Sequence, residues 1–218
     1  AMCENTIDAK LDEKTLKACD IVLVCLYPSD CVEFIIENKD NFKKGAKVID
    51  CAGVKRSVCE KAADIAKENG FIFIGGHPMA GTVNSGYANS KSNMFKGASM
   101  ILCPCDCDIA VLNEVREFFA TMFSKIVYTT PKEHDRIIAY TSQLAHVVSN
   151  AYIKSPTDKS QKGFSAGSYK DMVRVAKLNH KMWTELFFEN KDNLIFELDT
   201  LIKNLEKYKN ALCNDDKD

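Results

Sequence analysis

The stretch AKVIDCAGVKRSVCEKAADIAKENGFIFIGG, residues 46–76, decides the fold of this chain. Two short β-branched runs, AKVID and FIFI, flank a segment in which Val58, Ala62 and Ala66 share one helical face. Gly70 follows this segment and can end its helix in the left-handed conformation. Neither run alternates regularly with polar residues, which is typical of strands buried on both faces of a parallel sheet. The stretch therefore predicts a strand–helix–strand unit of an α/β fold.

Further β-branched runs lie on both sides of this unit, namely IVLVCL at 21–26, ASMILC at 98–103 and KIVY at 125–128. Such strands, separated by helices, predict a mostly parallel sheet that is covered on both faces. After Thr130 no strand pattern follows, and TPKE at 130–133 has the form of a capping box that opens a long helix. We therefore expect a partial Rossmann-like α/β domain at 1–130 and an all-helical domain at 131–218.

The end of the helical part carries a regular apolar seam. Its residues recur at alternating steps of four and three: Leu194, Leu198, Leu201, Leu205, Tyr208 and Leu212. A single apolar stripe of this kind packs either inside one protomer or against a second subunit. Periodicity leaves both interpretations open.

Composition excludes several classes of function. The net charge is −1, from 29 basic and 30 acidic residues, and no Lys/Arg cluster alternates with aromatic residues, so we expect no nucleic-acid partner. No apolar run approaches the ~18–20 residues of a membrane span. The first residues lack the features of a signal peptide, so we expect a cytoplasmic protein.

The ten cysteines do not have the spacing of a disulfide framework in a small secreted domain. Cys25, Cys51 and Cys103 lie in apolar, strand-like runs, and we expect reduced, mostly buried thiols. The run CPCDC, residues 103–107, lacks the C-x2-C pairs that are usual in zinc sites. It predicts the end of a strand and a loop, without a metal.

Three of the predicted strands end in residues that can carry chemistry: Tyr27 and Pro28, Gly53 and Val54, and His77. In a doubly wound sheet, ligands bind beyond these carboxyl ends. A neutral imidazole there can accept a hydroxyl proton near neutral pH. The small residues of GGHPMAGTVNSG, residues 75–86, would let the backbone approach a ligand, although a histidine that only caps a turn is the alternative.

GGHPMAGTVNSG resembles the segment that carries the catalytic histidine in the prephenate dehydrogenase family. The resemblance continues, in the same order along the chain, through ACDIVLVCLYP (18–28), VIDCAGVKRSV (48–58), SNMFKGASMILCP (92–104), SQLAH (142–146), GSYKDMVRVA (167–176) and NHKMW (179–183).

This resemblance implies roles for individual residues. His77 would take the proton of the substrate's ring hydroxyl, and Arg174 would bind a substrate carboxylate. The other residues implied to contact substrate are Ser142, His146, Thr82 and Lys170, and those implied to contact the nicotinamide cofactor are Leu26, Tyr27, Pro28, Gly53 and Val54. For Lys170, a solvated helix face is the alternative. His134, which is followed by Asp135 as in the family, is interpreted as structural or as lying at the seam of the two domains, with a catalytic role as the alternative.

The implied activity is that of a prephenate dehydrogenase of tyrosine biosynthesis. Prephenate would be oxidised and decarboxylated to 4-hydroxyphenylpyruvate with NAD or NADP, by a homodimer formed through the helical domain. An arogenate dehydrogenase is one alternative. A dimeric scaffold that binds no cofactor and catalyses nothing is another.

Several features depart from the family's pattern. The G-x-G-x-x-G pattern that binds a pyrophosphate is missing, and AMCENTIDAK at 1–10 resembles the tail of the family's second helix, so we expect the chain to begin within the fold. The residue that separates NAD from NADP would precede it. Gly53 stands where serine is frequent, Val83 replaces a glutamate, and Gln143 and Ala145 interrupt the family's S-H-L-P-H.

Overall fold

A computed structural model describes residues 8–82 and 86–217 of the chain. The expectations for the first residues of the chain, up to residue 7, and for Val83 lie outside these ranges. The chain divides into two compact units, Ala1–His134 and Asp135–Asp218, and each is described by itself.

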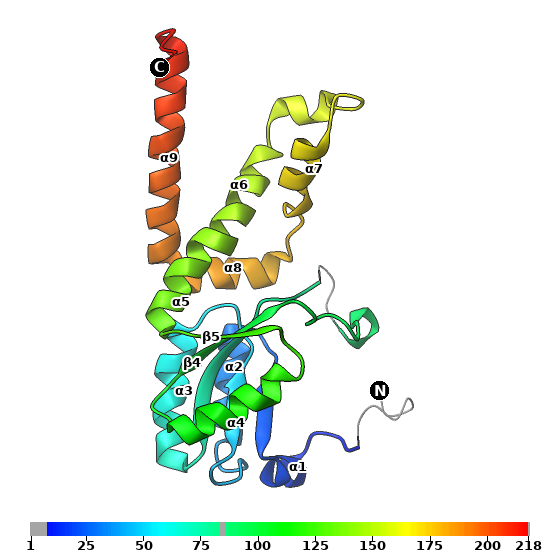
Figure 1. The fold of residues 1–218 in the computed structure, drawn as a ribbon, viewed down its shortest axis with the longest axis vertical. Coiled ribbons are helices and arrows are strands. Elements are labelled where there is room, and N and C mark those ends of the chain that lie inside the picture. The colour runs from blue at the N-terminus through cyan, green and yellow to red at the C-terminus, as the bar shows by residue number, and fades with distance from the viewer. Residues whose placement is uncertain (1–7, 83–85, 218) are drawn as a thin grey trace. The chain divides into compact units, whose positions relative to one another are not determined.

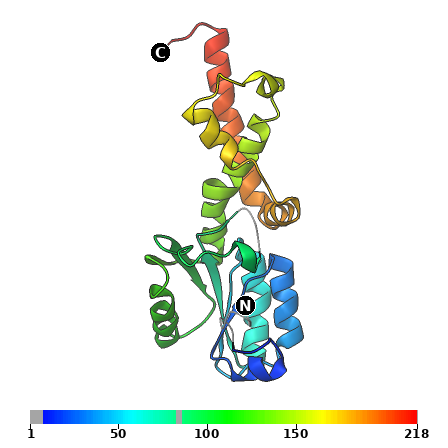
Figure 2. The same ribbon diagram turned by 90° about the vertical axis from the view of Figure 1, so that its right-hand side faces the viewer.

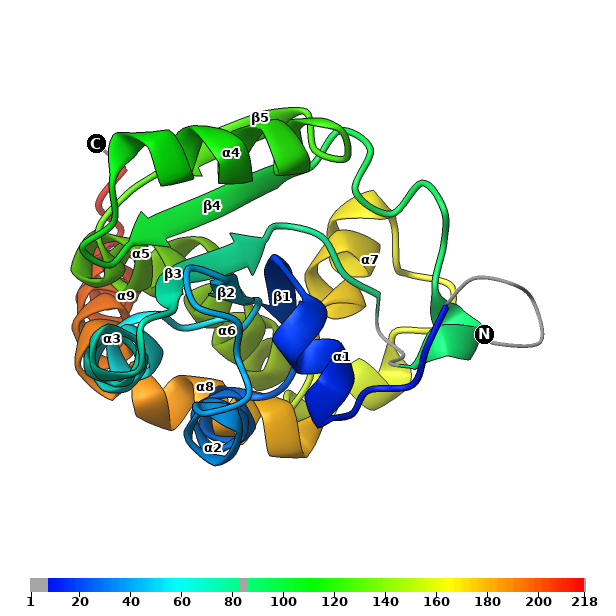
Figure 3. The same ribbon diagram turned by 90° about the horizontal axis from the view of Figure 1, so that it is seen from below.

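The first unit contains a five-stranded sheet with the order β1-β2-β3-β4-β5 (Figure 1), and all five strands are labelled in Figure 3. Its strands are β1 (Ile21–Val24), β2 (Lys47–Asp50), β3 (Ile72–Pro78), β4 (Ser99–Pro104) and β5 (Lys125–Tyr128). All pairs are parallel except β3 with β4, which run antiparallel. The predicted mostly parallel sheet is thus confirmed. The antiparallel pair follows from the connection, because the described part of 79–98 forms only the short helix η2 (Tyr87–Asn89) and no covering crossover helix.

Helices cover both faces of this sheet. Besides α1 (Glu13–Ala18), the first unit contains α2 (Pro28–Asn38), α3 (Arg56–Asn69) and α4 (Ile109–Ala120). Figures 2 and 3 show α2 and α3 on one face and α4 on the other. On β2, Val48 packs in the core under α2 and α3, while its neighbour Ile49 packs in the core under α4. Alternate residues therefore enter opposite cores, which explains why the strands are apolar throughout.

The helix predicted between β2 and β3 is α3. Its buried residues include Val58, Ala62 and Ala66, and Gly70 ends it with a φ of 73° in the left-handed region. The backbone N–H of Gly70 donates to the carbonyl of Ala66 at 2.8 Å. Both features of the quoted stretch are confirmed.

The described residues of the second unit form helices joined by loops, and they contain no strand. The unit comprises α5 (Pro131–Ile138), which begins in the first unit, η3 (Ala139–Leu144), α6 (Ala145–Tyr152), η4 (Pro156–Ser160), α7 (Gly167–Arg174), α8 (His180–Glu189) and α9 (Lys191–Cys213). Thr130 Oγ1 accepts a hydrogen bond from the Glu133 N–H at 3.2 Å and so caps α5. The predicted long helix forms, but its middle, η3, has the wider π-helical turn.

Gln143 links η3 to the helices that follow through hydrogen bonds. It is 1% exposed, and its Nε2 donates to the Leu186 carbonyl at 2.9 Å. Asn190 Nδ2 donates to Gln143 Oε1 at 2.9 Å and to the Asp135 carbonyl at 2.8 Å. The glutamine that departs from the family's pattern therefore satisfies buried backbone and side-chain groups at a helix junction.

The seam of α9 divides into two parts. Leu194 is 6% exposed and Leu198 and Leu201 are half-buried, whereas Leu205, Tyr208 and Leu212 are 56%, 73% and 80% exposed. Only the first part of the seam therefore packs within the protomer. Among the helices of the described residues, none combines the length and hydropathy needed to cross a bilayer.

Candidate functional site

Gly75 and Gly76 bring β3 into close contact with its neighbours. A Cβ on Gly76 would lie 2.4 Å from the Asp50 carbonyl oxygen, and one on Gly75 would lie 2.7 Å from Cys59 Sγ. Real Cβ atoms essentially never approach backbone so closely. The two glycines are therefore required by packing, and they place His77, the next residue, at the end of the strand.

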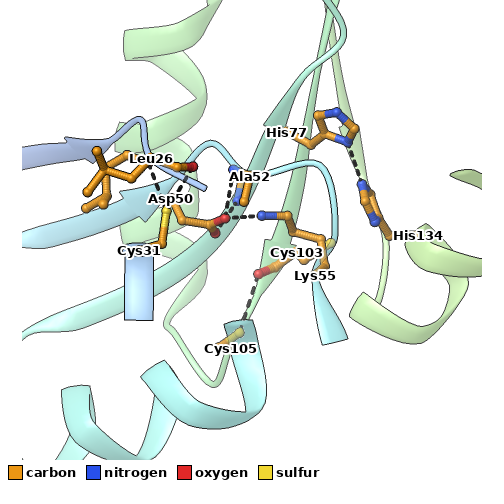
Figure 4. A network of polar contacts seen from close by, with 11 residues as sticks. Leu26, Cys31, Asp50, Ala52, Lys55, His77, Cys103, Cys105 and His134 are labelled. Atoms are coloured by element: carbon orange, nitrogen blue, oxygen red, sulfur yellow. Dashed lines mark hydrogen bonds and ion pairs between the residues drawn. The ribbon is translucent and has the colours of Figure 1, made fainter. Parts of the chain in front are cut away.

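A buried ion pair lies beside these glycines. Asp50, the last residue of β2, and Lys55 are both fully buried, and Lys55 Nζ donates to Asp50 Oδ2 (Figure 4). The same carboxylate accepts the N–H of Ala52 at 3.0 Å on Oδ2 and the N–H of Gly76 at 3.2 Å on Oδ1. Burial opposes the charge on Lys55, but Asp50 and neighbouring thiols raise its pKa above the usual value. The pair ties the turn after β2 to β3, one residue before His77.

His77 forms a hydrogen bond with a second histidine. Its Nδ1 lies 2.8 Å from Nε2 of His134, in the first turn of α5, and the two ring centroids are 5.0 Å apart (Figure 4). His77 is partly exposed, whereas His134 is 2% exposed. Burial, then His134 and Lys55, lower the pKa of His77 well below 6.5. His77 is therefore neutral at pH 7 and able to accept a proton.

Several thiols lie around this edge of the sheet. None of the described cysteines forms a disulfide; Cys103 is buried as expected and Cys51 is half-buried, but Cys25 is exposed because it follows the last residue of β1. The Cys51 thiol hydrogen-bonds to Cys25 and lowers the pKa of Cys25 to about 7. Within residues 8–82 and 86–217, no three side chains of His, Cys, Asp or Glu are grouped to hold a metal ion.

The residues expected to contact a cofactor follow β1 and β2. Because Val24 pairs with Asp50 in parallel register, these two turns lie at the same edge of the sheet. Leu26 is 45% exposed there, Tyr27 precedes α2, and Pro28 is its first residue. Gly53 is half-buried.

Two other predicted residues of the first unit differ in exposure. The Val54 side chain is fully buried, so only its backbone is placed to contact a ligand. Thr82 is exposed, in the segment after β3.

The residues expected to contact substrate in the second unit lie on three helices. Ser142 in η3 and His146 in α6 are half-buried, and Lys170 and Arg174 in α7 are exposed. Ser149 Oγ, also on α6, donates to the Met172 carbonyl of α7. The unit therefore brings α6 against α7, the helix that ends in Arg174.

The protonation of His146 follows from its contacts. Its Nδ1 lies 2.8 Å from the carbonyl oxygen of Val175, the residue after Arg174. A carbonyl only accepts hydrogen bonds, so Nδ1 carries the proton and Nε2 of the neutral ring is an acceptor. Burial lowers the pKa of His146, while the bond to Val175 opposes this shift. The Trp183 ring packs against the imidazole, with centroids 3.8 Å apart.

Three residues of the first-unit network were missed or undervalued from the sequence. The sequence favours a structural interpretation of His134, and its patterns do not single out Asp50 or Lys55. A carboxylate that ends a strand buried on both faces needs a partner, and this requirement was a usable signal for Asp50. No local pattern connects His134 with His77.

The first unit has the architecture of the doubly wound α/β proteins, with polar and titratable groups gathered beyond the carboxyl ends of its strands. The chain belongs to the prephenate dehydrogenase family, as its motifs predicted. The family model described as "Prephenate dehydrogenase, nucleotide-binding domain" matches residues 2–128, and "Prephenate dehydrogenase, dimerization domain" matches residues 130–218.

Individual proteins support this assignment. The chain is 25% identical over 214 residues to the prephenate dehydrogenase of Lactococcus lactis subsp. cremoris, covering 95% of this chain and 59% of that protein. Synechocystis arogenate dehydrogenase superposes with a TM-score of 0.80 at 26% identity, covering 94% of this chain and 75% of that one. Prephenate dehydrogenase from Aquifex aeolicus in complex with hydroxyphenyl propionate and NAD+ superposes with a TM-score of 0.72 at 26% identity. This match covers 90% of this chain and 70% of that one. The chain thus spans about three fifths of its Lactococcus relative.

Proposed function

We propose that this protein is a prephenate dehydrogenase, which oxidises and decarboxylates prephenate to 4-hydroxyphenylpyruvate with NAD. The observation that carries the proposal is His77: a neutral imidazole at the edge of the sheet, with Nδ1 engaged by His134. This arrangement leaves Nε2 to face a ligand. The Aquifex relative, which binds NAD+ and a hydroxyphenyl compound, supports the same chemistry.

In this reaction, His77 Nε2 accepts the proton of the ring hydroxyl while hydride leaves the carbon that bears it. Loss of the ring carboxylate as CO2 supplies the electron pair that makes the ring aromatic, and the product oxygen recovers the proton. Arg174 holds a substrate carboxylate, for which the planar guanidinium is suited. The nicotinamide, when bound, supplies the hydride acceptor.

The turns after β1 and β2 fit the nicotinamide end of such a cofactor. Leu26 exposes apolar surface at the carboxyl edge, and Gly53 carries no side chain that would block approach. Tyr27, Pro28 and the backbone of Val54 complete the proposed contacts. NADP is equally compatible with these residues, since none of them is proposed to reach the ribose.

Replacing His77 with Asn in the full chain tests the proposal. We expect kcat to fall at least about a hundredfold while KM stays within a few-fold, because a general base acts in the chemical step. The matched control is His180→Asn, at an exposed position in the first turn of α8, which should leave both constants unchanged. An unchanged rate in His77→Asn refutes the base. Failure of the wild-type chain to turn over prephenate or arogenate, or to bind NAD, favours the scaffold alternative.

Arogenate dehydrogenase is the second candidate, and His146 favours it. Arogenate carries an ammonium group where prephenate carries a keto oxygen. An ammonium donates hydrogen bonds, so it suits the His146 Nε2 acceptor, whereas a keto oxygen does not. If His146 binds this group, His146→Phe should lower kcat/KM about tenfold more for arogenate than for prephenate. Equal decreases in kcat/KM for the two substrates would show that His146 does not bind the amino group.

The proposed assembly is a homodimer formed through the second unit. Exposed apolar residues continue along α9 beyond its buried start, and they include Ile202, Leu205, Tyr208 and Leu212. Burial of such a stripe against a second copy is the usual outcome for an apolar helix face. The first unit, in this proposal, binds the dinucleotide. The cytoplasmic location and the absence of a nucleic-acid partner stay predictions from the sequence.

A further inference from the structure

The contact between His77 and His134 constrains both rings. Two imidazole nitrogens 2.8 Å apart form a hydrogen bond only if one of them carries a proton and the other does not. The rings are tilted by 58° to each other, so they do not stack face to face. His134 is 2% exposed, and its backbone N–H is held by the Thr130 carbonyl at 2.9 Å. Its ring is therefore fixed by the start of α5.

Only one direction of this hydrogen bond leaves His77 competent as a base. If His134 donated, the neutral His77 would carry its proton on Nε2 and could not accept another proton there. If His77 Nδ1–H donates to His134 Nε2, the lone pair of His77 Nε2 is free for a substrate hydroxyl. We propose that His134 is the positioning residue that holds His77 in the Nδ1–H tautomer and orients its Nε2 toward the substrate. This inference rests on the proposed function.

The same contact also acts during proton transfer. When His77 becomes an imidazolium, its Nδ1–H bond to neutral His134 becomes charge-assisted and therefore stronger. Lys55, which also lowers the pKa of His77, forms an ion pair with Asp50.

Two variants of His134 separate positioning from folding. His134→Gln keeps a hydrogen-bond acceptor on a side chain of similar length, and His134→Leu removes it. We expect His134→Leu to lower kcat by on the order of 10- to 100-fold with KM within about threefold, as for a lost charge-assisted bond. His134→Gln should recover most of that loss. Equal activity of His134→Leu and wild type, or equal loss in both variants at unchanged stability, would overturn the proposal.

A direct measurement keeps the inference testable without turnover. In the wild-type full chain, 15N spectra of the His77 ring at neutral pH should show a protonated Nδ1 and an unprotonated Nε2. His77 assigned to the Nε2–H tautomer would overturn the inference, even if the variants fold poorly. This result does not depend on the substrate. A chain that shows the expected tautomer but oxidises neither prephenate nor arogenate would refute the proposed function alone.

Discussion

Replacing Lys55 with Met should strongly destabilise the first unit. The change leaves the fully buried Asp50 carboxylate with only the N–H groups of Ala52 and Gly76 as partners. Removing one member of a buried ion pair typically costs about 3–5 kcal/mol. The variant can avoid a buried unpaired charge if the carboxyl takes up a proton. For an aspartate of reference pKa about 3.9, this protonation costs about 4 kcal/mol at pH 7. We therefore expect the free energy of unfolding to fall by about 3–4 kcal/mol.

Protonation of the carboxyl predicts how the loss of stability depends on pH. A carboxyl that gains a proton in the folded variant makes the variant relatively more stable as the pH falls. The difference from wild type should shrink by up to about 1.4 kcal/mol per unit between roughly pH 7 and pH 5. Urea titrations followed by circular dichroism, at constant protein concentration, measure this difference in the free energy of unfolding. Trp183, the only tryptophan, lies in the second unit, and its fluorescence reports that unit separately.

Two matched variants control this experiment. Lys43 forms an exposed ion pair with Asp20 at 2.5 Å, with side chains 49% and 73% exposed, so Lys43→Met should cost less than about 1 kcal/mol. Asp50→Asn combined with Lys55→Met leaves no buried charge and should be more stable than Lys55→Met alone. The reasoning is wrong if Lys55→Met costs no more than Lys43→Met, or if the double variant is as unstable as the single one.

Three further predictions concern reactivity, pH and assembly. At neutral pH, Cys25 should react with iodoacetamide faster than the exposed Cys213, because Cys51 lowers the pKa of Cys25 to about 7. Cys51→Ala should slow the reaction of Cys25. Mass spectrometry of labelled peptides measures both rates, and equal rates for Cys25 and Cys213 would contradict the prediction. Because the pKa of His77 is lowered, the acid limb of the pH profile of kcat/KM should lie below pH 6.5. For the same reason, the stability that the neutral His77 ring contributes should be lost as the pH falls. An acid limb above pH 6.5 contradicts this prediction. Leu205→Glu with Leu212→Glu should give a monomer in light scattering if α9 forms the dimer, and a persisting dimer would place the interface elsewhere.

Local pattern predicted most of the architecture. The five strands coincide with five β-branched runs, and the helix of the quoted stretch begins and ends close to its predicted positions. The motifs around His77 were sufficient to identify the family. These features are readable because side-chain periodicity and turn chemistry are set by residues a few positions apart.

Other features depended on contacts that no local pattern specifies. The antiparallel pairing of β3 with β4 was not expected, nor was the π-helical turn in η3. In the sequence, Gln143 stands out only as a departure from a motif, yet its side chain forms hydrogen bonds with groups on α8 and at the start of α9. Such side chains acquire their roles from packing between distant elements.

By itself, the sequence determined the strand and helix pattern, the family, and the histidine on which the proposed chemistry depends. Only the tertiary structure decided that His134, 57 positions further along the chain, hydrogen-bonds to His77, and that Asp50 and Lys55 are fully buried beside it. The physical reason is that periodicity acts over a few residues, whereas a hydrogen bond or a desolvated charge pair depends on which distant segments the fold brings within about 3 Å.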